Sequence, residues 1–220
     1  MLDLSKIAYV APKLPRFEVN PDKFWKWWDN CNVPIMRNKP WTTATGHTKP
    51  ARPDYGEFWN GVTIYQSGHS SLWTINDKPN ADLFSELITD ILNALPWYKV
   101  AGITLLSNNG AIPFHNDERP VAGSSNIYGP AAVRVMLFDD VENRTFQIQS
   151  ETTNEIFTPD LRSGPNLFMF NDTVNFKHGA QKCISGRKII IRIDGALLHP
   201  IQLAEYLTSQ IAAGAYYGGI

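Results

Sequence analysis

Cysteine is scarce in this 220-residue chain: it occurs only as Cys31 and Cys183, in no spacing typical of a metal site or a redox pair. We therefore expect reduced thiols and a cytoplasmic location, although one disulfide between the two remains open. Long apolar runs are absent too, and none approaches the roughly 20 residues that a membrane helix needs. The first residues, MLDLSKIAYVAPKLP, lack the basic start and apolar core of a secretory signal. These absences predict a protein with no membrane partner.

The chain also lacks an excess of charge of either sign. Its 20 basic and 21 acidic residues are interspersed and give a formal net charge of −1. Such a balance provides no global attraction to nucleic acid, which counts against a nucleic-acid partner without excluding a local basic groove. Disorder is excluded as well, because an apolar fraction of 43%, with 12% aromatic residues, is ample for a packed core.

Length and texture predict a single domain over residues 1–220, with an irregular, proline-rich N-terminal extension over residues 1–79. We expect the extension to pack on or cover the rest of the chain. It contains one predicted helix, PDKFWKWWDN, and two predicted strands, GVTIYQS and SLWTI. The tryptophans of the helix interleave with Lys23 and Lys26, as in a stacking platform for nucleic acid. The small basic excess favours the other interpretation, an aromatic helix packed on a sheet.

Residues 80–200 begin with a helix and continue as short β-like runs. The segment NADLFSELITDILNAL has apolar residues at helical spacing and ends at Pro96. The runs that follow are KVAGITLL, AIPFHND, AAVRVMLF, TFQIQS, NEIFTP, NLFMFND, NFKHGAQKC and KIIIRID. This pattern predicts a mainly β fold, a sandwich, jelly roll or barrel, with flanking helices. The end of the chain predicts a last helix, IQLAEYLTSQIAA, and a flexible tail, GAYYGGI.

The stretch IPFHNDERP carries the first candidate metal ligands, His115 and Asp117. Residues i and i+2 of a strand point to the same side, so one imidazole and one carboxylate would project into the same space. A polar turn after a strand explains the pair equally well. A further ligand elsewhere in the chain is therefore needed to distinguish a metal site from a turn.

His178 fits best as that further ligand, because it opens the penultimate strand of the β region. The other three histidines lie in turn-like surroundings or after the last strand. Two histidines and one carboxylate form a facial triad, which leaves three positions open on ferrous iron, as oxygen chemistry requires. Their positions in the sequence make His115, Asp117 and His178 the candidate metal site.

An arginine follows His178 by nine residues, and a second one lies further along the same predicted strand. A guanidinium binds a carboxylate through two parallel charge-assisted hydrogen bonds, so either Arg187 or Arg192 suits the distal carboxylate of a dicarboxylate cosubstrate. Strand alternation does not separate them, because isoleucines flank both faces. The interval from His178 favours Arg187.

These motifs resemble the iron(II)/2-oxoglutarate-dependent oxygenases, and most closely the aspartyl/asparaginyl β-hydroxylase-like group. The resemblance rests on HND at 115–117, on KHGAQKCISGRKI at 177–189 and on the ending RKIIIRIDGALLHP. It covers about residues 80–200 and implies a double-stranded β-helix, a jelly-roll or cupin-like fold. It also implies Fe(II), 2-oxoglutarate and O2 as cofactor and cosubstrates.

The resemblance further implies roles for individual residues. His115, Asp117 and His178 would bind iron, and Arg187 the distal carboxylate of 2-oxoglutarate. Arg134 matches an arginine beside the cosubstrate or substrate carboxylate, with a surface ion pair to Asp139 or Glu142 as the alternative. The remaining candidates are Asn126 and Tyr128 for substrate binding, and Asn171 and Asp172, which either orient His178 or form a plain turn.

The predicted function is thus a 2-oxoglutarate-dependent dioxygenase, a hydroxylase of an amino-acid or peptidyl side chain. Its substrate would be a small molecule, a peptide or a protein. Two alternatives stay open. One is a cupin-like protein that binds a metal or a small ligand without 2-oxoglutarate chemistry, and the other is a noncatalytic β-sandwich interaction domain.

Overall fold

The computed structural model describes most of the chain, with gaps. The described residues are 3–30, 59–66, 81–97, 99–108, 111–116, 130, 132–138, 145–159, 161, 164–173, 175–181, 183, 188–196 and 200–220. The helices are η1 (Leu4–Lys6), α1 (Pro21–Asn30), α2 (Ala81–Ala94) and α3 (Pro200–Ala212). The strands are β1 (Ile7–Ala11), β2 (Trp59–Gln66), β3 (Lys99–Asn108), β4 (Ile112–His115), β5 (Ala132–Phe138), β6 (Phe146–Ser150), β7 (Ile156–Phe157), β8 (Leu167–Phe170), β9 (Phe176–Ala180), β10 (Ile189–Ala196) and β11 (Tyr216–Gly219).

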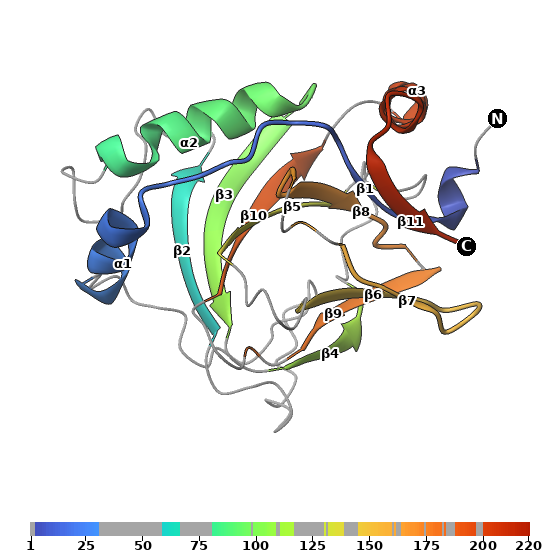
Figure 1. The fold of residues 1–220 in the computed structure, drawn as a ribbon, viewed down its shortest axis with the longest axis horizontal. Coiled ribbons are helices and arrows are strands. Elements are labelled where there is room, and N and C mark those ends of the chain that lie inside the picture. The colour runs from blue at the N-terminus through green and yellow to red at the C-terminus, as the bar shows by residue number, and fades with distance from the viewer. Residues whose placement is uncertain are drawn as a thin grey trace.

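The strands form two antiparallel sheets that face each other (Figure 1). The larger has the order β11-β1-β8-β5-β10-β3-β2, and the smaller has the order β4-β9-β6-β7. Of the eight strands from β3 to β10, the first, eighth, third and sixth are neighbours in the larger sheet. The second, seventh, fourth and fifth are neighbours in the smaller one. This strand order is that of a jelly roll, or double-stranded β-helix, so the predicted mainly β fold class is confirmed.

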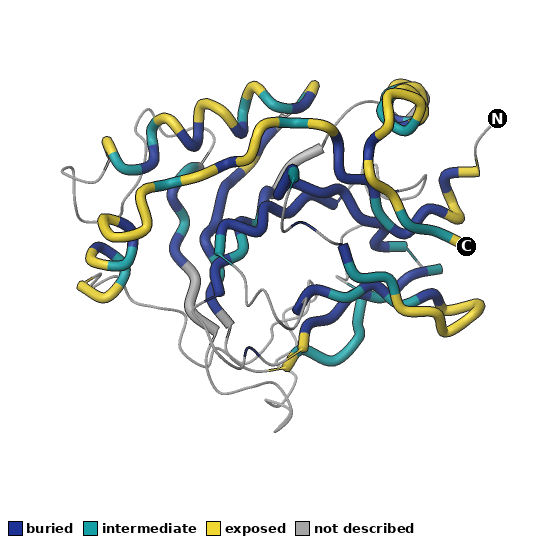
Figure 2. The backbone as a smooth tube through the Cα atoms, in the orientation of Figure 1, coloured by how far each residue is buried: buried dark blue, intermediate teal, exposed yellow. Residues whose placement is uncertain are grey.

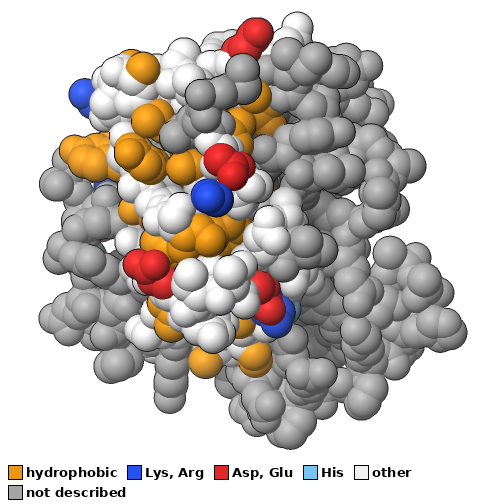
Figure 3. Space-filling model, turned by 90° about the vertical axis from the view of Figure 1, so that its right-hand side faces the viewer, with side chains coloured by type: hydrophobic (Ala, Val, Ile, Leu, Met, Phe, Trp, Pro, Cys, Tyr) orange, Lys and Arg blue, Asp and Glu red, His pale blue; other side chains and the backbone are white. Residues whose placement is uncertain are grey.

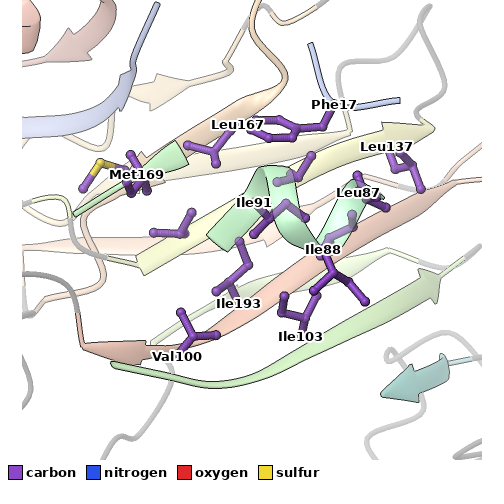
Figure 4. Close-up of a cluster of buried hydrophobic side chains, with 14 of the residues drawn as sticks. Phe17, Leu87, Ile88, Ile91, Val100, Ile103, Leu137, Leu167, Met169 and Ile193 are labelled. Carbon is purple, nitrogen blue, oxygen red and sulfur yellow. The ribbon is translucent and has the colours of Figure 1, made fainter. Parts of the chain in front are cut away.

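The larger sheet packs its outer face against the helices. Alternate residues of its central strands, among them Ile103 and Ile193, form one core cluster with Ile88 and Ile91 of α2 (Figure 4). This cluster is the helix-side core. Each such side chain contributes roughly 1.5–3 kcal/mol when it is fully buried. The outward face of α2 stays exposed (Figure 2). Among the described residues, no helix is long and apolar enough to cross a membrane.

A second core cluster fills the space between the two sheets. It is aromatic, with Phe146 and Phe176 from the smaller sheet and Phe168 and Phe170 from the larger. Phe146 makes edge-on contacts with Phe168 and Phe170, with ring centroids 5.0 and 5.1 Å apart. These contacts hold the two sheets together next to the candidate site.

The N-terminal extension is less irregular than expected. Strand β1 lies within the larger sheet between β11 and β8, and β2 forms the opposite edge beside β3. The prolines near the apolar run IAYVA favoured a loop, but this run forms β1. It is apolar enough to be buried as a strand once it pairs with the neighbouring strands of the sheet. Helix α1 packs Phe24 and Trp27 into the helix-side core, which confirms packing as the role of its aromatic residues. The predicted strand SLWTI lies outside the described residues.

The prediction of a flexible tail was wrong, because residues 216–219 form β11 and pair with β1. The glycines of β11 let its backbone lie close to β1, because a Cβ atom on Gly218 would lie only 2.6 Å from Cε1 of Tyr9. Strand β11 is an edge strand, and its Tyr216 and Tyr217 are exposed. Hydrophobic side chains are also visible at the surface of the face shown in Figure 3. Cys183 is buried, whereas Cys31 lies outside the described residues.

Candidate functional site

The structure brings two of the predicted metal ligands together. His115 ends β4 and His178 lies in the middle of β9, and the two are direct partners in the antiparallel pairing of these strands. Their ring centroids are 4.4 Å apart. Two residues far apart in sequence thus present adjacent imidazoles, as a shared metal ion requires.

Both rings are anchored through the same nitrogen. Nδ1 of His115 lies 2.9 Å from the carbonyl oxygen of Pro113, and Nδ1 of His178 lies 3.2 Å from Oδ1 of Asp172. A carbonyl oxygen and an ionised carboxylate only accept, so Nδ1 is the donor in each case. In the neutral rings the lone pair is then on Nε2, the nitrogen that binds a metal when Nδ1 is held in this way.

The surroundings of His178 restrict its ring further. Its ring is stacked on Phe146 at 5.9 Å, with an interplanar angle of 14°, and meets Phe170 edge-on at 4.9 Å. The side chains of His178 and Asp172 are 8% and 0% exposed. A buried ring held on two sides by aromatic residues keeps one orientation, and the low exposure strengthens its contact with the carboxylate.

Of the two polar residues expected near His178, only one contacts it. Asp172 accepts from its Nδ1, as expected of a residue that orients a metal ligand. Asn171 instead donates from Nδ2 to the carbonyl oxygen of Ile7 at 3.1 Å and so joins β8 to β1. Asn171 therefore has a structural role between these two strands.

Several predicted site residues lie outside the described residues. They are Asp117 of the candidate metal site, Arg187, Asn126 and Tyr128, and the same holds for the rejected candidates His47, His69 and His199. Within the part of the chain that the structure describes, no group of three or more histidine, cysteine or acidic side chains is arranged to hold a metal. The third ligand therefore stays a prediction.

Arg134 is buried rather than at the surface, and its alternative partners Asp139 and Glu142 lie outside the described residues. Only 5% of Arg134 is exposed, and Nη1 donates to the carbonyl oxygen of Val133 at 2.9 Å. Its guanidinium lies 5.1 Å above the ring of Phe170, a cation–π contact. Phe170 also touches His178, so one aromatic ring lies between the guanidinium and the histidine pair.

The structure resolves the face of β10 on which Arg192 lies. Ile191 and Ile193 are in the helix-side core, and Ile190 packs against the aromatic cluster between the sheets. Arg192 is the direct partner of Arg134 on β5, and it lies on the interior side with it. Sequence reasoning missed this cross-strand pairing because isoleucines occupy both faces of the strand.

Lys188 is a further cation that the sequence did not single out. It directly precedes β10 and is 1% exposed. Lysine is almost never fully buried, so the residue type alone predicts a surface position. No sequence signal distinguishes Lys188 from the solvated lysines of the chain.

Comparison with known proteins adds little to this geometry. No family model and no curated protein matches the sequence. One similar solved structure is described as a prolyl hydroxylase in complex with a hypoxia inducible factor oxygen degradation domain peptide fragment, from Trichoplax adhaerens. It is 10% identical, has a TM-score of 0.47, and the match covers 96% of this chain and 88% of that one. At this TM-score the likeness carries no argument. The strand order by itself defines the chain as a double-stranded β-helix protein.

Proposed function

We propose that this chain is an Fe(II)- and 2-oxoglutarate-dependent dioxygenase, a hydroxylase of an amino-acid or peptidyl side chain. The observation that carries the proposal is the cross-strand pair of His115 and His178 in a double-stranded β-helix, each ring held through Nδ1. Two imidazoles anchored in this way are suited to bind one ion through Nε2.

The donor set fits ferrous iron. With Asp117, which follows β4 by two residues, the two histidines make the two-histidine, one-carboxylate set that leaves positions open for cosubstrate and oxygen. When bound, the iron with 2-oxoglutarate and O2 supplies the oxidising power for C–H hydroxylation. The role of the protein is to orient His178 through Asp172 and to exclude water with the aromatic cluster.

Arginines provide the site for the cosubstrate. In this proposal Arg187 binds the distal carboxylate of 2-oxoglutarate through two parallel hydrogen bonds. Arg134 supports it from β5, because its guanidinium is buried on the interior face beside Phe170. Asn126 and Tyr128 are the proposed substrate-binding residues.

The test is turnover of the cosubstrate. The purified protein is incubated with iron(II), ascorbate and 2-oxoglutarate, and succinate is measured, including the background formed without substrate. We expect succinate from the parent, and its loss in the His178→Ala variant. His199→Ala is the matched control, since it removes a histidine outside the proposed site. Absence of succinate under all conditions would reject the dioxygenase.

A second variant separates the proposal from a cupin-like protein without 2-oxoglutarate chemistry. Replacing Arg187 by alanine is expected to weaken 2-oxoglutarate binding by about tenfold or more, since a charge-assisted pair is lost. Calorimetric titration of 2-oxoglutarate into the metal-loaded protein measures this change. An unchanged affinity would favour the cupin-like alternative.

A further inference from the structure

The side chain of Asn116 joins the end of β4 to the turn between β8 and β9. Its Nδ2 atom donates to the carbonyl oxygens of Thr173 and Phe176, at 2.7 and 2.6 Å. A side-chain amide nitrogen carries two hydrogen atoms, so both donors of Asn116 are used on the backbone. The N–H group of Phe176 also donates to the carbonyl oxygen of Thr173, at 3.2 Å, and closes the turn. A single amide therefore holds both ends of this turn.

The turn lies in the segment that carries His178 and its carboxylate partner. Asp172 directly precedes Thr173, and His178 follows Phe176 by two residues. On the other side of the contact, Asn116 directly follows His115, the last residue of β4. The two hydrogen bonds of Asn116 thus connect the segment of one proposed iron ligand to the segment of the other.

The backbone pairing of β4 with β9 is irregular close to the histidines. Its register shifts between Ile112 and His115, and β4 ends at His115. An irregularity of this kind disrupts the local ladder of backbone hydrogen bonds. The amide of Asn116 adds two cross-strand hydrogen bonds at the point where the rings of His115 and His178 lie 4.4 Å apart. It therefore fixes a part of the sheet that the ladder alone leaves weakly held.

We infer that Asn116 is a positioning residue for the proposed metal site, because its two hydrogen bonds set the separation of His115 and His178. This inference rests on the proposed function, since it concerns the same ion. Asn116 acts through the backbone of both segments, whereas Asp172 acts directly on the ring of His178. A metal site tolerates a displacement of only about 0.5 Å in its ligands, so a small shift of the end of β4 is enough to weaken binding.

Metal binding tests the inference without relying on turnover. Asn116→Leu keeps the approximate shape of the side chain and removes both donors, and Asn116→Ala removes them without a bulky replacement. We expect the Mn²⁺ affinity of both variants to fall about tenfold, the lower end of the range for residues that orient metal ligands. Calorimetric titration of Mn²⁺ into the purified protein measures this change. The visible absorption of bound Co²⁺ reports the arrangement of its ligands, and we expect it to differ from that of the parent.

Asn166 provides a matched control, because its Nδ2 atom also donates to two backbone carbonyl oxygens. These belong to Phe17 and Met136, at 2.8 and 3.1 Å. Asn166 directly precedes β8, at the opposite end of that strand from Asp172. Asn166→Leu is expected to lower stability while the Mn²⁺ affinity and the Co²⁺ spectrum stay as in the parent. Thermal unfolding confirms that each variant is folded at the temperature of the titration.

Three outcomes overturn the inference. If both Asn116 variants match the parent in Mn²⁺ affinity and Co²⁺ spectrum, Asn116 does not position the ligands, and the proposed metal site still stands. If Asn166→Leu loses as much Mn²⁺ affinity as Asn116→Leu, the loss follows from stability alone. If the parent binds no Mn²⁺, the metal site is rejected together with the dioxygenase. A protein whose metal affinity depends on Asn116 but which forms no succinate would reject the dioxygenase and leave the positioning role intact.

Discussion

Asp172 and His178 form a buried pair in which Oδ1 of the carboxylate lies 3.2 Å from Nδ1 of the imidazole. The contact joins a residue two positions after the end of β8, in the larger sheet, to the centre of β9 in the smaller one. It therefore links the framework of the double-stranded β-helix directly to the orientation of a proposed iron ligand.

Replacing Asp172 by asparagine is expected to lower metal affinity about 10- to 100-fold, the usual effect of losing a carboxylate that orients a metal-bound histidine. Titration with Fe(II) or Mn²⁺, followed by calorimetry, measures it. The matched control is Asn171→Ala, which removes the hydrogen bond to Ile7 and is expected to lower stability while metal affinity stays near that of the parent. Equal metal affinities in Asp172→Asn and the parent would contradict the orienting role.

Replacing Ile91 by alanine is expected to lower the free energy of unfolding by about 2–5 kcal/mol, because a fully buried side chain of α2 would leave a cavity on the larger sheet. Urea unfolding followed by circular dichroism gives the value. Asp90→Ala, on the exposed side of the same helix, should change it by less than about 0.5 kcal/mol. Similar losses in both variants would show that α2 is not packed as described.

Replacing Gly218 by valine is expected to detach β11 from β1, because even a Cβ at this position would lie 2.6 Å from the Tyr9 ring. The expected loss of stability is about 1–3 kcal/mol, with faster proteolysis of the C-terminal segment. Gly164→Ala is the control, since its added Cβ would meet Tyr216 at an ordinary 3.5 Å. Protection of the segment in Gly218→Val at the level of the parent would refute the pairing.

Burial raises the pKa of the Tyr206 phenol, which packs at the edge of the helix-side core. The neutral phenol is thus favoured in the folded state. The stabilisation that it adds to the free energy of unfolding is fully present below the unfolded pKa of about 10. Above that pH the unfolded chain loses the proton first, and stability falls as pH rises towards the folded pKa. We expect Tyr206→Phe to show a weaker decline between about pH 9 and pH 11 in urea unfolding. An identical decline in parent and variant would contradict the shift.

The sequence predicted helices α1 and α2 well because each has strong local signals. Proline at the first helical position and aromatic spacing mark α1, while a regular apolar stripe marks α2. It failed at β11, where two glycines indicate flexibility by local criteria. Their role in the structure is to let the strand approach Tyr9 and Lys6, which lie at the other end of the chain.

Residue type and spacing also predicted that His115 and His178 belong together. The imidazole side chain made each histidine a plausible metal ligand. The expected order of the strands predicted that the two histidines lie close together. Their pairing register, the anchoring of both Nδ1 atoms and the aromatic contacts of His178 depend on how the two sheets pack.

The sequence by itself determined the alternation of apolar and polar residues that produces eight short strands, along with the histidines and arginines placed on them. Only the tertiary structure decided that Arg192 lies on the interior face, that Arg134 is buried beside it, and that the first and last strands share one sheet. The physical reason is that strand formation depends on nearby residues, whereas the face and partner of a strand depend on which distant surfaces exclude water together.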